Sequence, residues 1–149
     1  MTPSQLAPIL VAAADALAAA HAEGIIHRDL KPDHIFLPVT GPVVTLLDFG
    51  LSLISGSAKK LTATGTVLGT PRYMAPEQIT SAHDAGARAD VYALGVIVYE
   101  ALAGDSPFSA SDQGQLLGAI MTGNTQPLEA RCPDIDTTLA AVVAQAMHK

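Results

Sequence analysis

Residues 25–50 read IIHRDLKPDHIFLPVTGPVVTLLDFG, and this stretch decides how the rest of the chain is interpreted. Short apolar runs flank a polar loop and predict strand-like pieces at 25–26, 35–37 and 43–47. Proline and glycine at 38–42 predict a hairpin turn between the last two pieces. The loop carries Asp29, and the third run leads directly to Asp48. We therefore expect two carboxylates at neighbouring strand ends.

Lys31 lies two residues after Asp29, so a carboxylate base and a fixed cation can face one reacting group. Phosphoryl transfer needs little covalent help from a protein. It needs an acceptor for the proton of the attacking hydroxyl, a cation near the transferred phosphate, and a carboxylate that holds a metal ion. Asp29, Lys31 and Asp48 together predict this chemistry.

Four motifs along the chain, in one order, carry a resemblance to a known family. They are HRDLKP at 27–32, DFG at 48–50, GTPRYMAPE at 69–77 and DVYALG at 90–95. In this order they resemble the catalytic loop, the metal-binding motif, the substrate-positioning segment and the central helix of eukaryotic-type protein kinases, including the bacterial ones. The lysine two places after Asp29 is typical of the serine/threonine kinases.

The resemblance implies an α+β, protein-kinase-like fold in which residues 1–149 form a partial kinase domain. This part would be the mostly helical C-terminal lobe with a short β-hairpin, from the helix before the catalytic loop to the penultimate helices. The N-terminal lobe would be absent, because the Gly-rich loop, the strand lysine and the hinge have no counterpart in 1–149.

By the same resemblance, Asp29 is the catalytic base, Lys31 neutralises the transferred phosphoryl group, and the Thr70 hydroxyl bridges the two. The implied cofactors are ATP and Mg²⁺, with Asp48 as the main metal ligand and Phe36 as the apolar surface under the adenine. The residues implied to contact the cofactors are Lys31, Asp33, His34, Phe36 and Asp48.

Other residues would support the site. His27 is implied to pack beneath Phe49, and Asp90 to hold the backbone of the catalytic loop while also capping its own helix. The segment that ends near residue 67 resembles an activation loop, in which a phosphate could pair with Arg28. The candidate phosphorylation sites are Thr62, Thr64 and Thr66. A plain polar loop is an equally good interpretation of that segment.

Two further departures from the family affect the site. His34 stands where the family has the asparagine that binds a second Mg²⁺, so Mg²⁺ binding should be impaired. Residue 149 precedes the arginine that pairs with the glutamate of the APE motif, so Glu77 should lack its usual partner. We also expect apolar residues such as Phe36 and Leu37 to be exposed and to favour self-association.

Two classes of function therefore stay open. The chain is either the catalytic half of a serine/threonine kinase, inactive without an N-terminal lobe, or a non-catalytic pseudokinase-like binding module or gene fragment. A small-molecule phosphotransferase shares a loop aspartate and a later metal aspartate. The segment 69–77 argues against that third option, because it resembles a platform for protein substrates.

The composition and net charge limit the classes of partner that we expect for this chain. With 49% hydrophobic and 15% charged residues, the chain is expected to form one globular domain. The net charge of −6, without a basic stripe, makes nucleic acid an unfavourable partner. The single cysteine, Cys132, and the apolar stretch 91–103, short and interrupted by Glu100, favour a cytoplasmic protein without a membrane segment. The expected partners are a protein substrate or the other kinase lobe.

Helices are predicted over five parts of the chain. The first begins after Thr2 in a capping box and ends near residue 23, before Gly24. A central, almost entirely apolar helix follows an N-cap at Asp90. The others are expected over 76–81, around 116–120 and around 139–147, while 84–88 is expected to be a loop.

Overall fold

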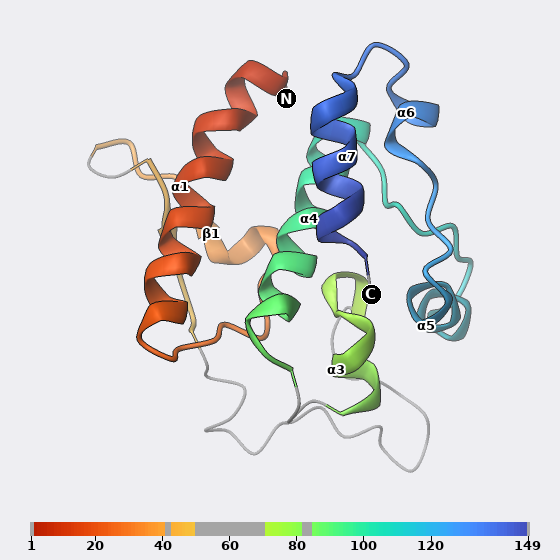
Figure 1. The fold of residues 1–149 in the computed structure, drawn as a ribbon, viewed down its shortest axis with the longest axis horizontal. Helices are drawn as coiled ribbons and strands as arrows, with labels where there is room; N and C mark the ends of the chain where they lie inside the picture. Colours follow the sequence, from red (N-terminus) through yellow and green to blue (C-terminus); the bar gives the residue numbers. More distant parts are fainter. Residues whose placement is uncertain (1, 41–42, 50–70, 82–84, 149) are drawn as a thin grey trace.

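The computed structural model describes residues 2–40, 43–49, 71–81 and 85–148 of this chain. Helices dominate it, and the only sheet in these ranges has two strands (Figure 1). The elements before residue 75 are α1 (Pro3–Ala22), the 3-10 turn η1 (Pro32–His34), β1 (Ile35–Phe36), β2 (Thr45–Leu46) and the 3-10 turn η2 (Pro71–Tyr73). The later elements are α3 (Pro76–Thr80), α4 (Ala87–Ala103), α5 (Gln113–Thr122), α6 (Leu128–Arg131) and α7 (Thr137–Ala146).

Helix α4 is the centre of the fold, as its apolar sequence predicts. It lies between α1 and α7, and it also contacts η2 and α6 (Figure 1). Nine of its residues are buried, including Tyr92, Val96 and Tyr99. A helix buried on most sides serves as a platform on which the other elements pack.

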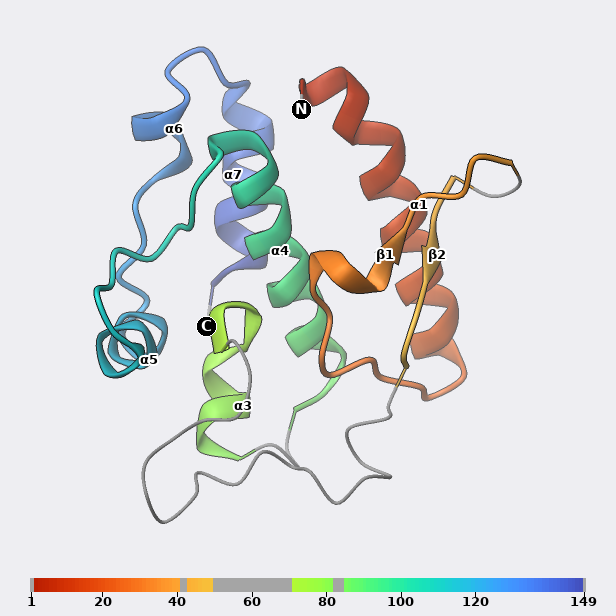
Figure 2. The same cartoon turned by 180° about the vertical axis from the view of Figure 1, so that it is seen from behind.

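Helix α1 begins with the predicted capping box. The Thr2 side chain accepts a hydrogen bond from the Gln5 amide, and the Gln5 side chain accepts one from the Thr2 amide. Gly24, in the left-handed region with φ 73°, follows the helix. The hairpin pairs β1 and β2 antiparallel, with Ile35 opposite Leu46, and β2 lies against α1 (Figure 2). Ile35 and Leu46 pack on a buried cluster that includes Leu17 of α1 and Ala93 and Ile97 of α4, so the hairpin lies against both helices.

The structure corrects three local predictions. Residues 25–26 form no strand. Helix α4 begins at Ala87 after an N-cap at Gly86, so Asp90 lies inside its first turn and does not cap it, and residues 87–88 are helical. The short helix α6 has no counterpart in the prediction, because four residues carry too little periodicity to be recognised.

Helix α1 lies within one residue of its predicted bounds, but its high hydropathy was not part of the prediction. Among the described residues it alone has the length and hydropathy to cross a membrane, whereas the prediction considered only 91–103. Core helices of soluble proteins meet the same criterion, and α1 packs through Leu6, Ala13 and Leu17. The expected absence of a membrane segment stays a prediction.

Candidate active site

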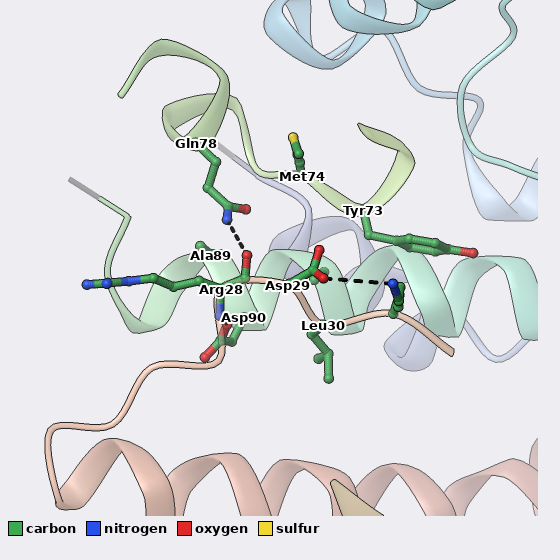
Figure 3. Close-up of a pocket in the computed structure, with 10 residues that line it drawn as sticks. Arg28, Asp29, Leu30, Tyr73, Met74, Gln78, Ala89 and Asp90 are labelled. Atoms are coloured by element: carbon green, nitrogen blue, oxygen red, sulfur yellow. Dashed lines mark hydrogen bonds and ion pairs between the residues drawn. The ribbon is translucent and has the colours of Figure 1, made fainter. Parts of the chain in front are cut away.

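The loop that carries Asp29 is held by hydrogen bonds on both sides of Arg28. Arg28 has a left-handed backbone with φ 63°, which is costly for a residue with a Cβ. The Asp90 carboxylate accepts from the amides of His27 and Arg28, each at 2.8 Å. The Gln78 side-chain amide donates to the Arg28 carbonyl at 2.7 Å (Figure 3). These contacts fix the strained residue, and with it the position of Asp29.

His27 is completely buried beneath this loop and packs on Phe49, with ring centroids 4.8 Å apart. Its Nε2 lies 2.8 Å from the Leu47 carbonyl, which can only accept, so Nε2 carries the proton. Its Nδ1 is then free to accept from the Asp29 amide at 3.4 Å. The ring is a structural link between the catalytic loop and the strand that leads to Asp48. This is the packing that the resemblance implied.

Asp29 itself is open to solvent. Its side chain is 39% exposed and lies 3.8 Å from the Lys31 ammonium group, which is 36% exposed. Asp29 extends toward Tyr73 and Met74, whereas Leu30 points the opposite way, toward α1 (Figure 3). A small pocket is lined by both the catalytic loop and the segment around η2. A carboxylate and a cation therefore face one open space.

His34, the last residue of η1, and Asp48, just after β2, form a second pair. The His34 Nδ1 lies 2.8 Å from the Asp29 carbonyl, and its Nε2 lies 3.7 Å from the Asp48 carboxylate. The His34 side chain is 11% exposed and the Asp48 side chain 58% exposed. Asp48, like Arg28, has a positive φ, here 62°. The structure thus brings together the two residues predicted to bind metal.

The other residues predicted to contact the cofactors are exposed in the structure. Asp33 is exposed on η1, and Phe36 on β1 is 54% exposed. Leu37 is also exposed, as expected for residues on the edge that would meet the other lobe. Phe36 offers an exposed apolar surface two residues after His34.

The segment after residue 70 is joined to α4 by Glu100. The Tyr73 hydroxyl donates to its carboxylate at 2.7 Å, and Arg72 forms an ion pair with it at 3.4 Å. Burial, followed by the hydrogen bond and the charge of Glu100, raises the pKa of Tyr73 well above its usual value. Tyr73 is therefore a neutral donor at ordinary pH, and Glu100 positions the segment against α4.

Glu77 is partly buried and forms no ion pair within the described ranges, which include Arg72, Arg88 and Arg131. Its negative charge contributes to raising the pKa of Tyr92, after the larger effect of burial.

Four predicted residues lie outside the described ranges: Thr62, Thr64, Thr66 and Thr70. The Arg28 side chain donates through Nε to the Ala85 carbonyl at 3.2 Å.

Sequence reasoning missed three supporting residues. His21, in the last turn of α1, lies 2.7 Å from the Asp90 carboxylate. Gln78 supports Arg28, and Glu100 holds Tyr73. Only Glu100 gave a sequence signal, since a lone acid in an apolar helix needs a partner when it is buried.

Comparison with known proteins agrees with this geometry. The protein kinase domain family matches residues 1–147, and the chain therefore belongs to that family. Its relatives include Serine/threonine-protein kinase Pkn1 of Myxococcus xanthus, which is 41% identical over 95% of this chain. PknH and PknB of Mycobacterium tuberculosis are 38% and 36% identical over 100% of it. It is thus a member of the bacterial-like, eukaryotic-type serine/threonine kinases.

The chain spans between 21% and 24% of the length of these relatives. A solved structure of Rad53 1-466 in complex with AMP-PNP matches with a TM-score of 0.67 and 31% identity. That match covers 90% of this chain and 32% of the Rad53 chain. The fold is the helical C-terminal lobe with its two-stranded hairpin, as the sequence predicted.

Proposed function

We propose that this chain is the catalytic lobe of a serine/threonine protein kinase, which transfers a phosphoryl group from ATP to a protein hydroxyl. The observation that carries the proposal is the Asp29–Lys31 pair, 3.8 Å apart and open to solvent on a loop fixed by Asp90 and Gln78. A rigid support under exposed reactive groups is what a reaction that depends on positioning requires. A cytoplasmic location is part of the proposal.

In this mechanism Asp29 would accept the proton of the substrate hydroxyl as the hydroxyl oxygen bonds to the terminal phosphorus of ATP and the bond from that phosphorus to the leaving ADP breaks. Lys31 places a positive charge on the side of Asp29 where the phosphoryl group would lie. The segment held by Tyr73 and Glu100 would position the substrate, because it faces Asp29 across the same pocket. Asp29 returns the proton to solvent after the product leaves.

ATP would supply the phosphoryl group, and a bound divalent ion would neutralise its negative charge. Asp48 fits Mg²⁺, which prefers carboxylate oxygens, whereas the imidazole of His34 does not fit so hard an ion. The matching Rad53 structure is a complex with AMP-PNP, which supports nucleotide binding by this fold. Phe36 offers an apolar surface on which an adenine ring can rest.

We further propose that residues 1–149 alone transfer no phosphate, since an N-terminal lobe would form the other wall of the nucleotide site. The test compares the isolated chain with a fusion in which the N-terminal lobe of PknB precedes residue 1. Transfer of labelled phosphate from ATP to serine- and threonine-containing peptides is measured for both.

We expect transfer by the fusion and none by the isolated chain. Asp29→Asn in the fusion should reduce the rate by roughly 10²–10⁴-fold, the usual contribution of a general base. The exposed Asp15→Asn on α1 is the matched control and should leave the rate unchanged. A well-folded fusion that binds ATP without transferring phosphate would support the pseudokinase-like alternative. Transfer by the isolated chain, abolished by Asp29→Asn, would refute the requirement for the second lobe.

A further inference from the structure

The side-chain amide of Gln78 bonds two segments that are distant in the sequence. Its Nε2 donates to the Arg28 carbonyl at 2.7 Å (Figure 3). Its Oε1 accepts from the backbone amide of Ala75 at 2.9 Å. These partners fix which end of the side chain is nitrogen, because a carbonyl only accepts and a backbone N–H only donates. A primary amide meets both demands, and it joins the catalytic loop to the segment that follows η2.

The bond to Arg28 acts on the peptide unit that leads into Asp29. Arg28 has φ 63°, a strained conformation that the surrounding contacts must hold. Asp90 holds the peptide unit before Arg28 by accepting from its amide at 2.8 Å. In the peptide unit after Arg28, the Asp29 amide makes a longer contact of 3.4 Å with His27 Nδ1. Gln78 is therefore the closer restraint on the peptide unit that orients Asp29.

The bond to Ala75 acts on the segment across from Asp29. Ala75 is completely buried, so without Gln78 its amide would lose the acceptor that satisfies it. Tyr73 and Met74 immediately precede Ala75, and both line the pocket that Asp29 and Gln78 also line (Figure 3). One side chain thus restrains the two opposite walls of this pocket.

We propose that Gln78 is a positioning residue, which fixes Asp29 relative to the segment that would hold the hydroxyl of a protein substrate. It acts through Arg28 and Ala75 and does not itself touch the reacting atoms. A reaction that depends on positioning is sensitive to such support, since a displacement of about 1 Å can cost roughly 10²-fold in rate. The proposal rests on the proposed function, because it assigns a role in the same reaction.

Two substitutions separate the two bonds. Gln78→Glu removes the donor to Arg28 but keeps an acceptor for Ala75, and a carboxylate is favourable in the first turn of a helix. Gln78→Met has a similar length, adds no charge and removes both bonds. Amide hydrogen exchange is measured by nuclear magnetic resonance in the 149-residue chain. Exchange of the Asp29 amide should become about tenfold faster in both variants, and that of the Ala75 amide only in Gln78→Met.

The effect on the reaction is measured in the fusion with the N-terminal lobe of PknB. The value of kcat should fall about tenfold or more in both variants, and KM for ATP should stay unchanged. KM for the peptide substrate should rise only in Gln78→Met, where the Ala75 amide loses its acceptor. A residue that merely stabilised α3 would not lower kcat in Gln78→Glu, which keeps that bond.

Gln115→Glu is the matched control. Gln115 lies in the first turn of α5, and its Oε1 accepts from the Ser111 amide at 3.2 Å, so the same chemical change is made at a comparable helix position. It should alter neither the exchange of the Asp29 amide nor kcat.

Three results would overturn the proposal. The first is an Asp29 amide that exchanges equally fast in the wild type and both variants. The second is an unchanged kcat in both variants of an active fusion. The third is a lower kcat in Gln78→Glu alone, because the added charge would then be the cause. A wild-type fusion that transfers no phosphate would instead argue against the proposed function, whereas the exchange measurement needs no activity and still decides whether Gln78 holds the loop.

Discussion

The two sides of the catalytic loop differ in how their polar groups are used. On the inner side Asp90 is 1% exposed and His27 is fully buried, and each hydrogen-bonds the backbone. On the outer side Asp29 and Asp48 are 39% and 58% exposed, and among the described residues their carboxylates lie 3.8 Å from Lys31 and 3.7 Å from His34. The inner side should therefore contribute stability and the outer side chemistry. Substitutions on the two sides should separate these roles.

The largest effect is expected for Asp90→Ala. It removes the acceptor of one buried and one partly buried amide, and hydrogen bonds to charged groups contribute about 1.5–3 kcal/mol each. The free energy of unfolding should fall by about 3–5 kcal/mol, measured by urea denaturation. Asp29→Asn, on the outer side, should change it by less than about 0.5 kcal/mol, because exposed ion pairs contribute little. Equal losses in both variants would contradict the division between the two sides.

Helix α4, which supports the loop from below, should be the next most sensitive, in this case to added side-chain volume. A Cβ at Gly95 would lie 2.9 Å from the Ala146 Cβ, where α4 packs against α7. Gly95→Ala should therefore lower the free energy of unfolding by about 1–3 kcal/mol through overpacking. Gly118→Ala on α5 meets open space and should raise it by about 0.5–1 kcal/mol. Thermal unfolding of both variants checks the contrast, and a neutral Gly95→Ala would show that α7 can move away.

A smaller effect is expected at Tyr73, on the segment that faces Asp29 across the pocket. Tyr73→Phe removes the donor to Glu100 and should cost about 1 kcal/mol at pH 7. The pKa of Tyr73 is raised in the folded state, so its contribution is complete below the unfolded value of about 10 and is lost as pH rises beyond it.

Urea denaturation from pH 7 to pH 11 should therefore show the wild type and Tyr73→Phe converging at the alkaline end. Tyr92→Phe is the control for burial alone: its pKa is also raised, so its difference from the wild type should change over the same alkaline range, but the substitution should cost less than Tyr73→Phe at pH 7. Equal costs of the two substitutions at pH 7 would refute the bond to Glu100 as the cause.

The sequence predicted the fold wherever a motif or a period carried the information. The capping box at Thr2, the antiparallel hairpin and the central helix were all recognisable, because each depends on local residue types. The start of α4 could not be predicted, because the helical residues before Asp90 show no periodic pattern of apolar side chains. The apolar residues at 25–26 have a high propensity for strands, but among the described residues no neighbouring strand pairs with them, and they form none.

At the site, the motif located Asp29, Lys31 and Asp48, but not the contacts that hold them. The bond from Gln78 to Arg28 joins residues 50 positions apart, and that from His21 to Asp90 joins residues 69 apart. Long-range bonds of single polar side chains leave no pattern in one sequence. Such contacts depend on how distant segments of the chain pack together, so only the structure shows them.

The smallest effect on stability, but a clear one on solubility, is expected at Phe36 on the outer edge. It is 54% exposed, and Leu37 and Val43 beside the hairpin are also exposed. Phe36→Ser should change the free energy of unfolding by less than about 0.5 kcal/mol, because little apolar area leaves a buried site. Binding of a hydrophobic dye and concentration-dependent association, measured by light scattering, should both fall, since contiguous apolar patches drive association.

Val142→Ser is the matched control for this prediction. Val142 is 57% exposed on α7, away from the hairpin, so losing it removes similar apolar surface from a different place. If the edge at Phe36 is the surface that another lobe or a second copy covers, only Phe36→Ser should reduce association. Equal reductions in both variants would mean that general hydrophobicity drives association. The edge at Phe36 would then not be a specific contact surface.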